Sequence, residues 1–362
     1  MDNLNVFDVL VVYSDTASSA GGHPSQGALP FPVAFGHANY NDAYAYFLET
    51  CQQLGLKAAF STANDIVAAG TCQSYWIFAD KRWQKSKKLC YAPQIFDKTT
   101  PNTKEKRLKR KLLFSSTLVK PFNNPHLAAL FFDKYKTYQE LPDFTIPTVE
   151  INDPSRAGIK QAIANLRTAT RNHLFRNDFS RGIVLKDRFG SGGNNIFKVT
   201  KNYINEIYAL IQQYPKLIFV LQPFLKFAKG YTYKNQKAAT DIRLIYQNGK
   251  IIQTYIRLAK DNDFRCNEHQ GGQLLYVSLA DIPQKVQLFS QKIALKLQQN
   301  HSLFALDYIV SDRGNVYFIE GNSKPGIDWD LALETNEKMS KKLIRGIVTE
   351  LASRILPLNP LF

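Results

Sequence analysis

The sequence predicts an α/β (α+β) protein, with a small α/β domain at the N-terminus followed by a larger region in which strands dominate. An apolar strand at residues 5–13 precedes a helical pattern at 39–56 and two short strands, the order typical of a small α/β domain. From Gly182 onward, strand patterns alternate with helices. A β-hairpin pattern at 304–326 follows near the C-terminus. These three observations define the expected fold class.

The other elements follow from apolar spacing and turn residues. The segment 121–125 (PFNNP) is read as a hinge, and Asp153-Pro154-Ser155 as the cap of a helix that runs to residue 172. Helices are expected at 126–132, 134–141, 203–214, 283–299 and 337–355, and strands at 183–186, 196–199, 217–222, 241–246 and 250–258. We therefore expect three domains, at residues 1–120, 121–220 and 221–362.

The composition is that of a folded protein rather than a disordered one. Of the 362 residues, 44% are hydrophobic and 21% are charged. The four cysteines lack zinc-type spacing, which is typical of reduced thiols in a cytosolic protein. The first residues lack a signal-peptide pattern, and no apolar run approaches the ~18 residues that span a bilayer. We expect a soluble, cytoplasmic protein without membrane association.

The formal charge of +16 and the isoelectric point near 9.5 predict anionic partners without identifying them. The densest basic cluster lies at residues 104–111 (KEKRLKRK). This cluster fits a nucleic-acid patch, but as a solvated face or loop it needs no function. Nucleic acid is therefore neither excluded nor favoured as a partner.

The C-terminal hairpin brings two acidic residues together. Residues 312–315 (DRGN) form the turn signal between two apolar runs. If Ser311 pairs with Val316 across this turn, Asp307 lies directly opposite Glu320. Facing carboxylates repel each other, so a positive group is expected between them.

Asn322 shares the face of Glu320, because side chains alternate along a strand. Together with Asp307 these residues form an all-oxygen donor set of the kind that Mg²⁺ prefers. The alternative is that a lysine or arginine neutralises the two carboxylates. The hairpin alone does not decide between a metal ion and a basic side chain.

A second motif combines a lysine with a glycine-rich loop. The strand at 183–186 delivers Lys186, and Gly190, Ser191, Gly192 and Gly193 follow before the next strand. Glycines let backbone N–H groups approach phosphate oxygens, and lysine adds a point charge. This order predicts a flap that closes over a nucleotide, although Gly/Ser turns between strands are also common.

A second hairpin is predicted around Asn248-Gly249, a preferred two-residue turn. It places Asp241 and Arg243 on one face and Arg257 on the other, unless a strand carries a bulge. Arg265 follows in a polar segment. Arginine forks bind phosphate or carboxylate, so the three arginines favour an anionic substrate and a phosphorylated intermediate. A surface salt bridge is the alternative for each.

In this order, the segments resemble those of ATP-grasp ligases, most of all the branch of glutathione synthetase and the ribosomal-protein glutamate ligases. The resemblance covers about residues 120–356. Its landmarks are the Lys186 strand with its glycine loop, 220–225 (VLQPFL), 241–243 (DIR), 263–272 (DFRCNEHQGG), and Asp307 with 320–322 (EGN) and Pro325-Gly326. It implies an ATP-grasp fold behind an N-terminal α/β domain at 1–120. The lid subdomain with the flap would occupy 121–220, and the second subdomain with the metal hairpin and C-terminal helix 221–362.

The resemblance also implies roles for individual residues. Lys134 and Lys186 would contact ATP phosphates under the flap of residues 190–193. Adenine would meet Gln222, Pro223 and Phe224, and the nucleotide would also contact Asp241, Arg265 and Asn267. The catalytic arginines would be Arg243, Arg257 and Arg265, and the Mg²⁺ ligands Asp307, Glu320 and Asn322, with Mn²⁺ as a second candidate ion. Pro223 departs from the family's pattern, because an acidic residue is common at that position.

The expected function is that of an ATP-dependent carboxylate–amine ligase, which forms ADP and an amide or peptide bond through an acyl phosphate. Its substrates would be an amino acid or an acidic peptide, and an oligomer is compatible with the sequence. The alternative is a non-catalytic ATP-binding module of the same fold. We expect Glu320→Gln and Asp307→Asn each to abolish Mg²⁺-dependent ADP formation in a folded protein.

Overall fold

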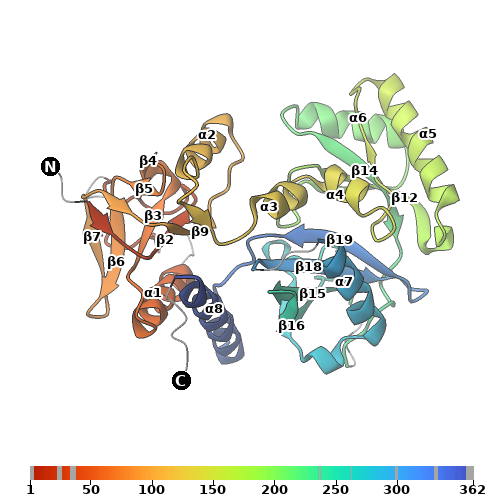
Figure 1. The fold of residues 1–362 in the computed structure, drawn as a ribbon. Coiled ribbons are helices and arrows are strands. Elements are labelled where there is room, and N and C mark those ends of the chain that lie inside the picture. The colour runs from red at the N-terminus through yellow and green to blue at the C-terminus, as the bar shows by residue number, and fades with distance from the viewer. Residues whose placement is uncertain are drawn as a thin grey trace. The chain divides into compact units, whose positions relative to one another are not determined.

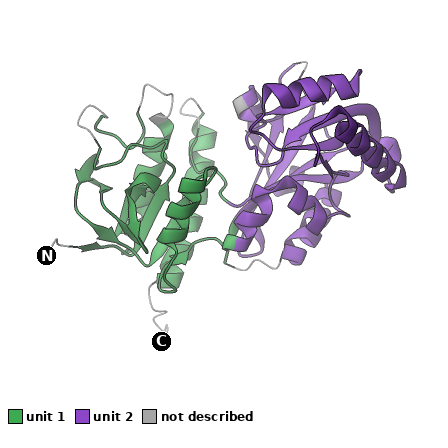
Figure 2. Ribbon diagram, turned by 90° about the horizontal axis from the view of Figure 1, so that it is seen from above, with its two compact units in different colours: residues 1–125, 301–303, 324–362 green, residues 126–300, 304–323 purple. Residues whose placement is uncertain are grey.

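The structure is a computed structural model that describes residues 4–22, 27–32, 38–234, 236, 238–261, 263–297, 301–329 and 333–355. It is a mixed α/β protein, as the sequence predicts (Figure 1). The chain divides into two compact units: unit 1 contains residues 1–125, 301–303 and 324–362, and unit 2 contains 126–300 and 304–323 (Figure 2). No helix within the described residues is long and apolar enough to cross a membrane.

The larger sheet of unit 1 contains β2 (Val9–Tyr13), β3 (Ala58–Thr62), β6 (Tyr75–Ala79), β7 (Arg82–Ser86), β9 (Gln94–Lys98) and β10 (Lys120–Pro121). Their order is β10-β9-β2-β3-β6-β7. The central β2 pairs in parallel with both β3 and β9. Residues 9–12 are completely buried, as expected of a parallel strand covered on both faces.

A smaller sheet of unit 1 has the order β1-β8-β5-β4 and consists of β1 (Asn5–Val6), β8 (Cys90–Tyr91), β5 (Thr71–Cys72) and β4 (Ile66–Ala68). The helix α2 (Lys104–Leu113) packs beside β4 and contains the basic cluster. Thr103 begins this helix by accepting the Lys106 backbone N–H. Leu113 anchors its last turn, because this side chain is fully buried.

The C-terminal helix belongs to unit 1. The helices α1 (Ala38–Gln53) and α8 (Glu334–Ile355) pack against each other, and α8 buries an apolar stripe that includes Leu343, Ile344, Ile347 and Leu351. The sequence analysis placed this helix in the domain 221–362, whereas the structure joins residues 324–362 to the N-terminal unit. The difference arises because the apolar stripe finds its partner on α1, far away in sequence.

Unit 2 contains two antiparallel sheets. The first has the order β11-β14-β12-β13 and consists of β11 (Val149–Glu150), β14 (Phe219–Leu225), β12 (Phe179–Asp187) and β13 (Ile196–Val199). The helices α5 (Arg156–Asn172) and α6 (Tyr203–Gln213) bury Ile159 and Ile207 against Leu185 and Leu221. These helices therefore cover one face of the sheet, and the other face remains for the site.

The second sheet has the order β17-β16-β15-β18-β19 and consists of β17 (Gln273–Tyr276), β16 (Lys250–Leu258), β15 (Thr240–Gln247), β18 (Leu303–Val310) and β19 (Val316–Asn322). Its core also takes side chains from α3 (Pro125–Phe132) and α7 (Gln284–Leu297), with α4 (Lys134–Glu140) following α3. Phe131, Val286, Leu306 and Phe318 are among the buried residues. The predicted end of α7 at residue 299 lies outside the described residues.

Two bulges set the register of the second sheet. Asp307 pairs with Glu320, as predicted. The turn register itself was wrong by one residue, because Val310 and not Ser311 pairs with Val316; a bulge after Asp307 compensates. In the other hairpin, a register shift at Ile245/Tyr246 pairs Asp241 with Arg257. Arg257 therefore shares the face of Asp241, the outcome that the sequence analysis tied to a bulge.

Candidate active site

One face of the first sheet of unit 2 carries polar and aromatic side chains. Cross-strand pairing places Lys186 opposite Val220, and Val184 opposite both Gln222 and Lys198. Because neighbouring residues of a strand point to opposite faces, Lys186, Gln222 and Lys198 share the face opposite to α5 and α6. This face thus presents two of the predicted nucleotide-contacting residues.

The glycine-rich loop lies against the segment that follows β16. Gly193 has a φ of +75°, and a Cβ at this position would lie 2.7 Å from Asn267 Oδ1. Gln270 Nε2 donates to Asn194 Oδ1 at 3.1 Å. The structure therefore brings the predicted flap and Asn267 together, through an approach that only glycine permits.

Lys134 links this loop to the C-terminal hairpin. Its Nζ donates to the Gly190 carbonyl and lies 3.9 Å from Glu320 Oε1. Asp133 caps α4 and pairs in two-point fashion with Arg188, at 2.7 Å for each contact, which fixes the start of the helix that carries Lys134.

The ammonium group of Lys186 has a lowered pKa. Burial lowers the pKa of Lys186 to about 8; the Lys134 charge acts in the same direction, and Glu320 opposes both. An anion that bound between the two lysines would relieve their mutual repulsion. The two lysines therefore form an anion-binding arrangement next to a carboxylate.

An aromatic group lies further along the same face. The Lys198 ammonium lies 3.5 Å from the centroid of the Phe224 ring, and the Phe224 and Phe264 rings meet edge to face with 5.5 Å between centroids. Gln222 donates through Nε2 to Thr148 at 2.8 Å, while its buried Oε1 has no hydrogen-bond partner among the described residues. Flat rings beside an unpaired acceptor suit a heteroaromatic base with an amino group.

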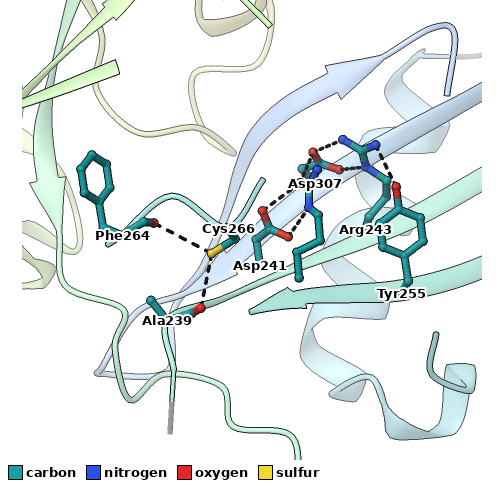
Figure 3. Close-up of polar contacts among 8 residues, drawn as sticks. Ala239, Asp241, Arg243, Tyr255, Phe264, Cys266 and Asp307 are labelled. Atoms are coloured by element: carbon teal, nitrogen blue, oxygen red, sulfur yellow. Dashed lines mark hydrogen bonds and ion pairs between the residues drawn. The ribbon is translucent and has the colours of Figure 1, made fainter. Parts of the chain in front are cut away.

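The face of the second sheet carries four buried ionised residues, Asp241, Arg243, Arg257 and Asp307, which we call the ion cluster (Figure 3). Arg243 donates to both Asp307 oxygens at 2.5 Å, and Arg257 Nη2 donates to Asp307 Oδ2 at 2.7 Å. Arg257 also pairs in two-point fashion with Asp241, at 2.8 Å for each contact. Two negative and two positive charges thus compensate each other within the cluster.

Burial and charge act in opposite directions within the ion cluster. Burial would raise the pKa of Asp307, but Arg243 and Arg257 together hold that pKa below its ordinary value. Burial raises the pKa of Asp241 and outweighs the attraction of Arg257, with the Asp307 charge adding to the rise. The pKa values of the two carboxyl groups are therefore shifted in opposite directions.

The predicted metal ligands do not all have the same surroundings. Asp307 is 1% exposed, and its arginine partners correspond to the alternative in which basic side chains neutralise the hairpin carboxylate. A carboxylate offers about four lone-pair sites, so three arginine contacts leave Asp307 one site, on Oδ1. Glu320 is more accessible, since its side chain is 26% exposed and its ion pair with Lys134 is long.

The chemistry of these oxygen donors fits a hard cation. Glu320 and Asn322 lie on one face of β19, and Asp307, with its remaining lone-pair site, is the cross-strand partner of Glu320 on β18. No three His, Cys, Asp or Glu side chains in the described ranges gather as a metal site; the expected set has two carboxylates and one amide. Arg265 does not join the ion cluster, because its guanidinium pairs with Asp263, with 2.9 Å between Nη2 and Oδ2.

Two antiparallel sheets that present lysines, a glycine flap and hairpin carboxylates within one compact unit define an ATP-grasp protein. A family model described as a RimK-like ATP-grasp domain matches residues 155–347. The chain therefore belongs to the RimK-like ATP-grasp family, which confirms the resemblance seen in the sequence.

Curated relatives include a probable alpha-L-glutamate ligase of Legionella pneumophila, 29% identical over 169 residues, which are 46% of either chain. A protein of the same description from Hydrogenovibrio crunogenus is 30% identical over 132 residues, 36% of this chain and 38% of that one. The chain thus spans less than half the length of these two curated relatives.

Solved structures share the fold over nearly the whole chain. D-cycloserine synthetase DcsG has a TM-score of 0.59 at 12% identity, covering 97% of this chain and 100% of that one. D-alanyl-alanine synthetase A of Vibrio cholerae has a TM-score of 0.57 at 12% identity, covering 96% of this chain and 98% of that one. Macrocyclase MdnC of Microcystis aeruginosa, solved with a precursor peptide, has a TM-score of 0.54 at 12% identity, covering 94% of this chain and 99% of that one. At this identity they show the fold alone.

The sequence analysis missed Lys198, Phe264 and Thr148. Lys198 stands in a strand whose register was not predicted, so nothing placed it beside Phe224. Phe264 lies in the quoted segment 263–272 but was passed over in favour of its charged neighbours. Pairing β13 with β12 by their apolar alternation would have placed Lys198 on the face of Lys186.

Proposed function

We propose that the chain is an ADP-forming, ATP-dependent carboxylate–amine ligase. The observation that carries the proposal is the convergence of Lys134, Lys186 and Gly190 beside Glu320 within one compact unit of a RimK-like ATP-grasp protein. Two lysines supply positive charge for a triphosphate, and the carboxylate supplies a ligand for its accompanying cation.

ATP binds with its base against Phe224 and Phe264, where the free Gln222 Oε1 accepts a hydrogen bond from the amino group of adenine. Pro223 has no N–H and therefore cannot donate to the base. Residues 190–193 cover the phosphates, and Lys134 and Lys186 neutralise them. Asn267 holds the flap through its contact with Gly193.

Glu320 and Asn322 would hold a Mg²⁺ ion, and Asp307 would contribute its remaining lone pair; Mn²⁺ has the same preference for oxygen ligands. The bound ion would withdraw negative charge from the phosphate oxygens. Within the chain, Arg243 and Arg257 fix the orientation of Asp307. Each guanidinium has five N–H donors, so both arginines keep donors for a phosphate oxygen after their contacts in the ion cluster.

The reaction proceeds in two displacements. An oxygen of the donor carboxylate attacks the γ-phosphorus, the bond to the β,γ-bridging oxygen breaks, and ADP leaves. The amine nitrogen of the acceptor then attacks the acyl carbon, inorganic phosphate leaves with the C–O bond electrons, and one proton is lost to water. Positioning and electrostatic stabilisation account for the catalysis, so no covalent protein nucleophile is required.

The substrate class is an amino acid or an acidic peptide. The net charge of +16 favours an anionic donor or acceptor. The curated relatives are described as glutamate ligases, and two structural neighbours, the D-alanyl-alanine synthetase and the macrocyclase, act on an amino acid or hold a precursor peptide. These descriptions support L-glutamate as the first substrate to test.

The proposal is tested by incubating the full chain with ATP, Mg²⁺ and a pool of amino acids and acidic peptides. We expect phosphate release that depends on the pool, and products whose mass is that of two components minus water. Glu320→Gln should reduce release about a hundredfold, while Glu334→Gln, on an exposed part of α8, should not change it. ATP binding without phosphate release in any pool would overturn the ligase and leave a nucleotide-binding module.

A further inference from the structure

The basic helix α2 divides its cations into two sets. The first set faces unit 1. Lys106 pairs with Asp15 at 2.9 Å, Arg110 Nε pairs with Asp97 at 2.8 Å, and Lys109 Nζ donates to the Ile66 carbonyl at 2.8 Å. These three residues attach the helix to its own unit, so they are not available to a partner.

The second set faces solvent. The side chains of Lys104, Arg107 and Lys111 are exposed and make no ion pair or hydrogen bond with the described part of the chain. Leu108 and Leu112 stand beside them at helical spacing, 59% and 39% exposed. A face of five residues therefore combines free cations with exposed leucines; we call it the α2 face.

The exposed leucines distinguish the α2 face from a solvated or a nucleic-acid-binding surface. A solvated helix face gains nothing from two adjacent leucines, and phosphates are contacted by cations and polar groups rather than by aliphatic side chains. The helix α7 serves as a comparison. Leu288 and Leu295 are 52% and 75% exposed there, but Lys285 donates to a backbone carbonyl and Lys296 lies 5.9 Å from the Phe144 ring centroid. Lys292 is the exposed cation between these two leucines, whereas Leu108 and Leu112 adjoin three exposed cations.

The position of Glu105 bears on the kind of partner. Glu105 is exposed, and it borders Leu108 and Leu112 on the side away from the lysines. An anionic bilayer would attract the basic side of the leucines and repel the acidic side, whereas helices that lie on membranes are basic along their polar face. Unequal charges on the two sides of a leucine pair are instead typical of helix–helix recognition.

We propose that the α2 face binds an acidic amphipathic helix of a partner polypeptide. Leucine-sized side chains of this helix would pack on Leu108 and Leu112, and its carboxylates would face Lys104, Arg107 and Lys111. The proposal does not depend on ligase activity, because no residue of the α2 face belongs to unit 2.

The test uses the full chain and, as the probe, a fluorescent three-heptad peptide whose leucine stripe has glutamates on one side and lysines on the other, followed by fluorescence anisotropy. We expect binding that weakens with salt, and a loss of about tenfold or more in Leu108→Ser/Leu112→Ser, since two partly exposed leucines bury further area against the peptide. The triple variant Lys104→Glu/Arg107→Glu/Lys111→Glu should bind the peptide weakly even at low salt, where charge attraction is screened least. The matched control Leu288→Ser/Leu295→Ser on α7 should bind like the wild type.

Three outcomes would overturn the proposal. The first is absence of peptide binding. The second is binding that the leucine substitutions on α2 and on α7 weaken equally. The third is a preference for phosphatidylserine vesicles or a single-stranded oligonucleotide that only the charge substitutions on α2 abolish. Circular dichroism of each variant shows whether a loss reflects unfolding.

Discussion

The ion cluster allows a quantitative prediction for Asp307→Asn. The sequence analysis expected this variant to stay folded, but the structure buries Asp307 and gives its carboxylate three arginine donors. The amide has no negative charge and only one oxygen for these donors. Arg257 keeps Asp241 as its partner, whereas Arg243 loses its only carboxylate within the described chain.

The expected cost follows from these contacts. Removing one partner of a buried ion pair destabilises a protein by about 3–5 kcal/mol, because the other charge remains buried without compensation. Total stabilities are about 5–15 kcal/mol, so the loss is a large fraction of the stability of unit 2. For a domain of this size, it corresponds to a fall of about 6–20 °C in melting temperature.

The assay separates the two units. Hydrogen–deuterium exchange of peptides from β15, β16 and β18 reports opening of the second sheet of unit 2. The three tryptophans, Trp76, Trp83 and Trp329, all lie in unit 1, so their fluorescence is an internal control. We expect much faster exchange in these strands of Asp307→Asn, and fluorescence typical of folded unit 1 in native buffer.

The double variant Arg243→Leu/Asp307→Leu completes the test. Replacing both charges by apolar side chains removes the uncompensated charge and should recover most of the lost stability. The reasoning is refuted if Asp307→Asn loses less than about 1 kcal/mol, which is the range of an exposed ion pair. It is also refuted if the double variant is less stable than the single one.

Three further predictions concern the flap, a lysine and α8. Because the pKa of Lys186 is about 8, the side chain loses its charge as the pH rises through that value, and ATP affinity should fall by up to about tenfold per pH unit above it. Lys186→Arg should flatten this profile by staying charged, and a wild-type affinity independent of pH from about 7 to 10 would contradict the assignment. Gly193→Ala should weaken ATP binding, because the added Cβ would collide with Asn267. The control Gly249→Ala has the same φ of +75° but open space around the added Cβ, so its ATP affinity should not change. Equal losses of ATP affinity in the two variants, measured by calorimetry, would exclude the collision as the cause. Ile347→Asn should destabilise unit 1 by about 3 kcal/mol through a buried polar group, seen as an earlier loss of tryptophan fluorescence, while an unchanged transition would argue against the packing of α8 in unit 1.

Much of the fold could be predicted from local patterns. Ser155 caps α5 as expected, and the bounds of β13 and β16 match the predicted strands. Such features depend on neighbouring residues only. The family resemblance added the order of the segments, which the family model confirms.

The site was less predictable, because bulges and distant partners shape it. Asp307 meets Glu320 only because a bulge offsets a turn that is one residue longer than predicted, and Arg257 reaches Asp307 through a second bulge. A bulge leaves little trace in apolar alternation, so its position cannot be read from the sequence. The pairing of Arg265 with Asp263 is the salt-bridge alternative that the sequence analysis left open, although its partner was not named there.

The assignment of α8 to unit 1 has a consequence for how the polypeptide matures. Residues 324–362 come after all of unit 2 in the order of synthesis, yet Leu343 and Ile347 fill the surface that α1 offers near the start of the chain. A nascent chain that has emerged only as far as β19 therefore leaves that surface uncovered. The native packing of the first unit is therefore complete only after the last helix has been synthesised, and until then an early domain exposes apolar surface of the kind that makes folding intermediates prone to aggregation.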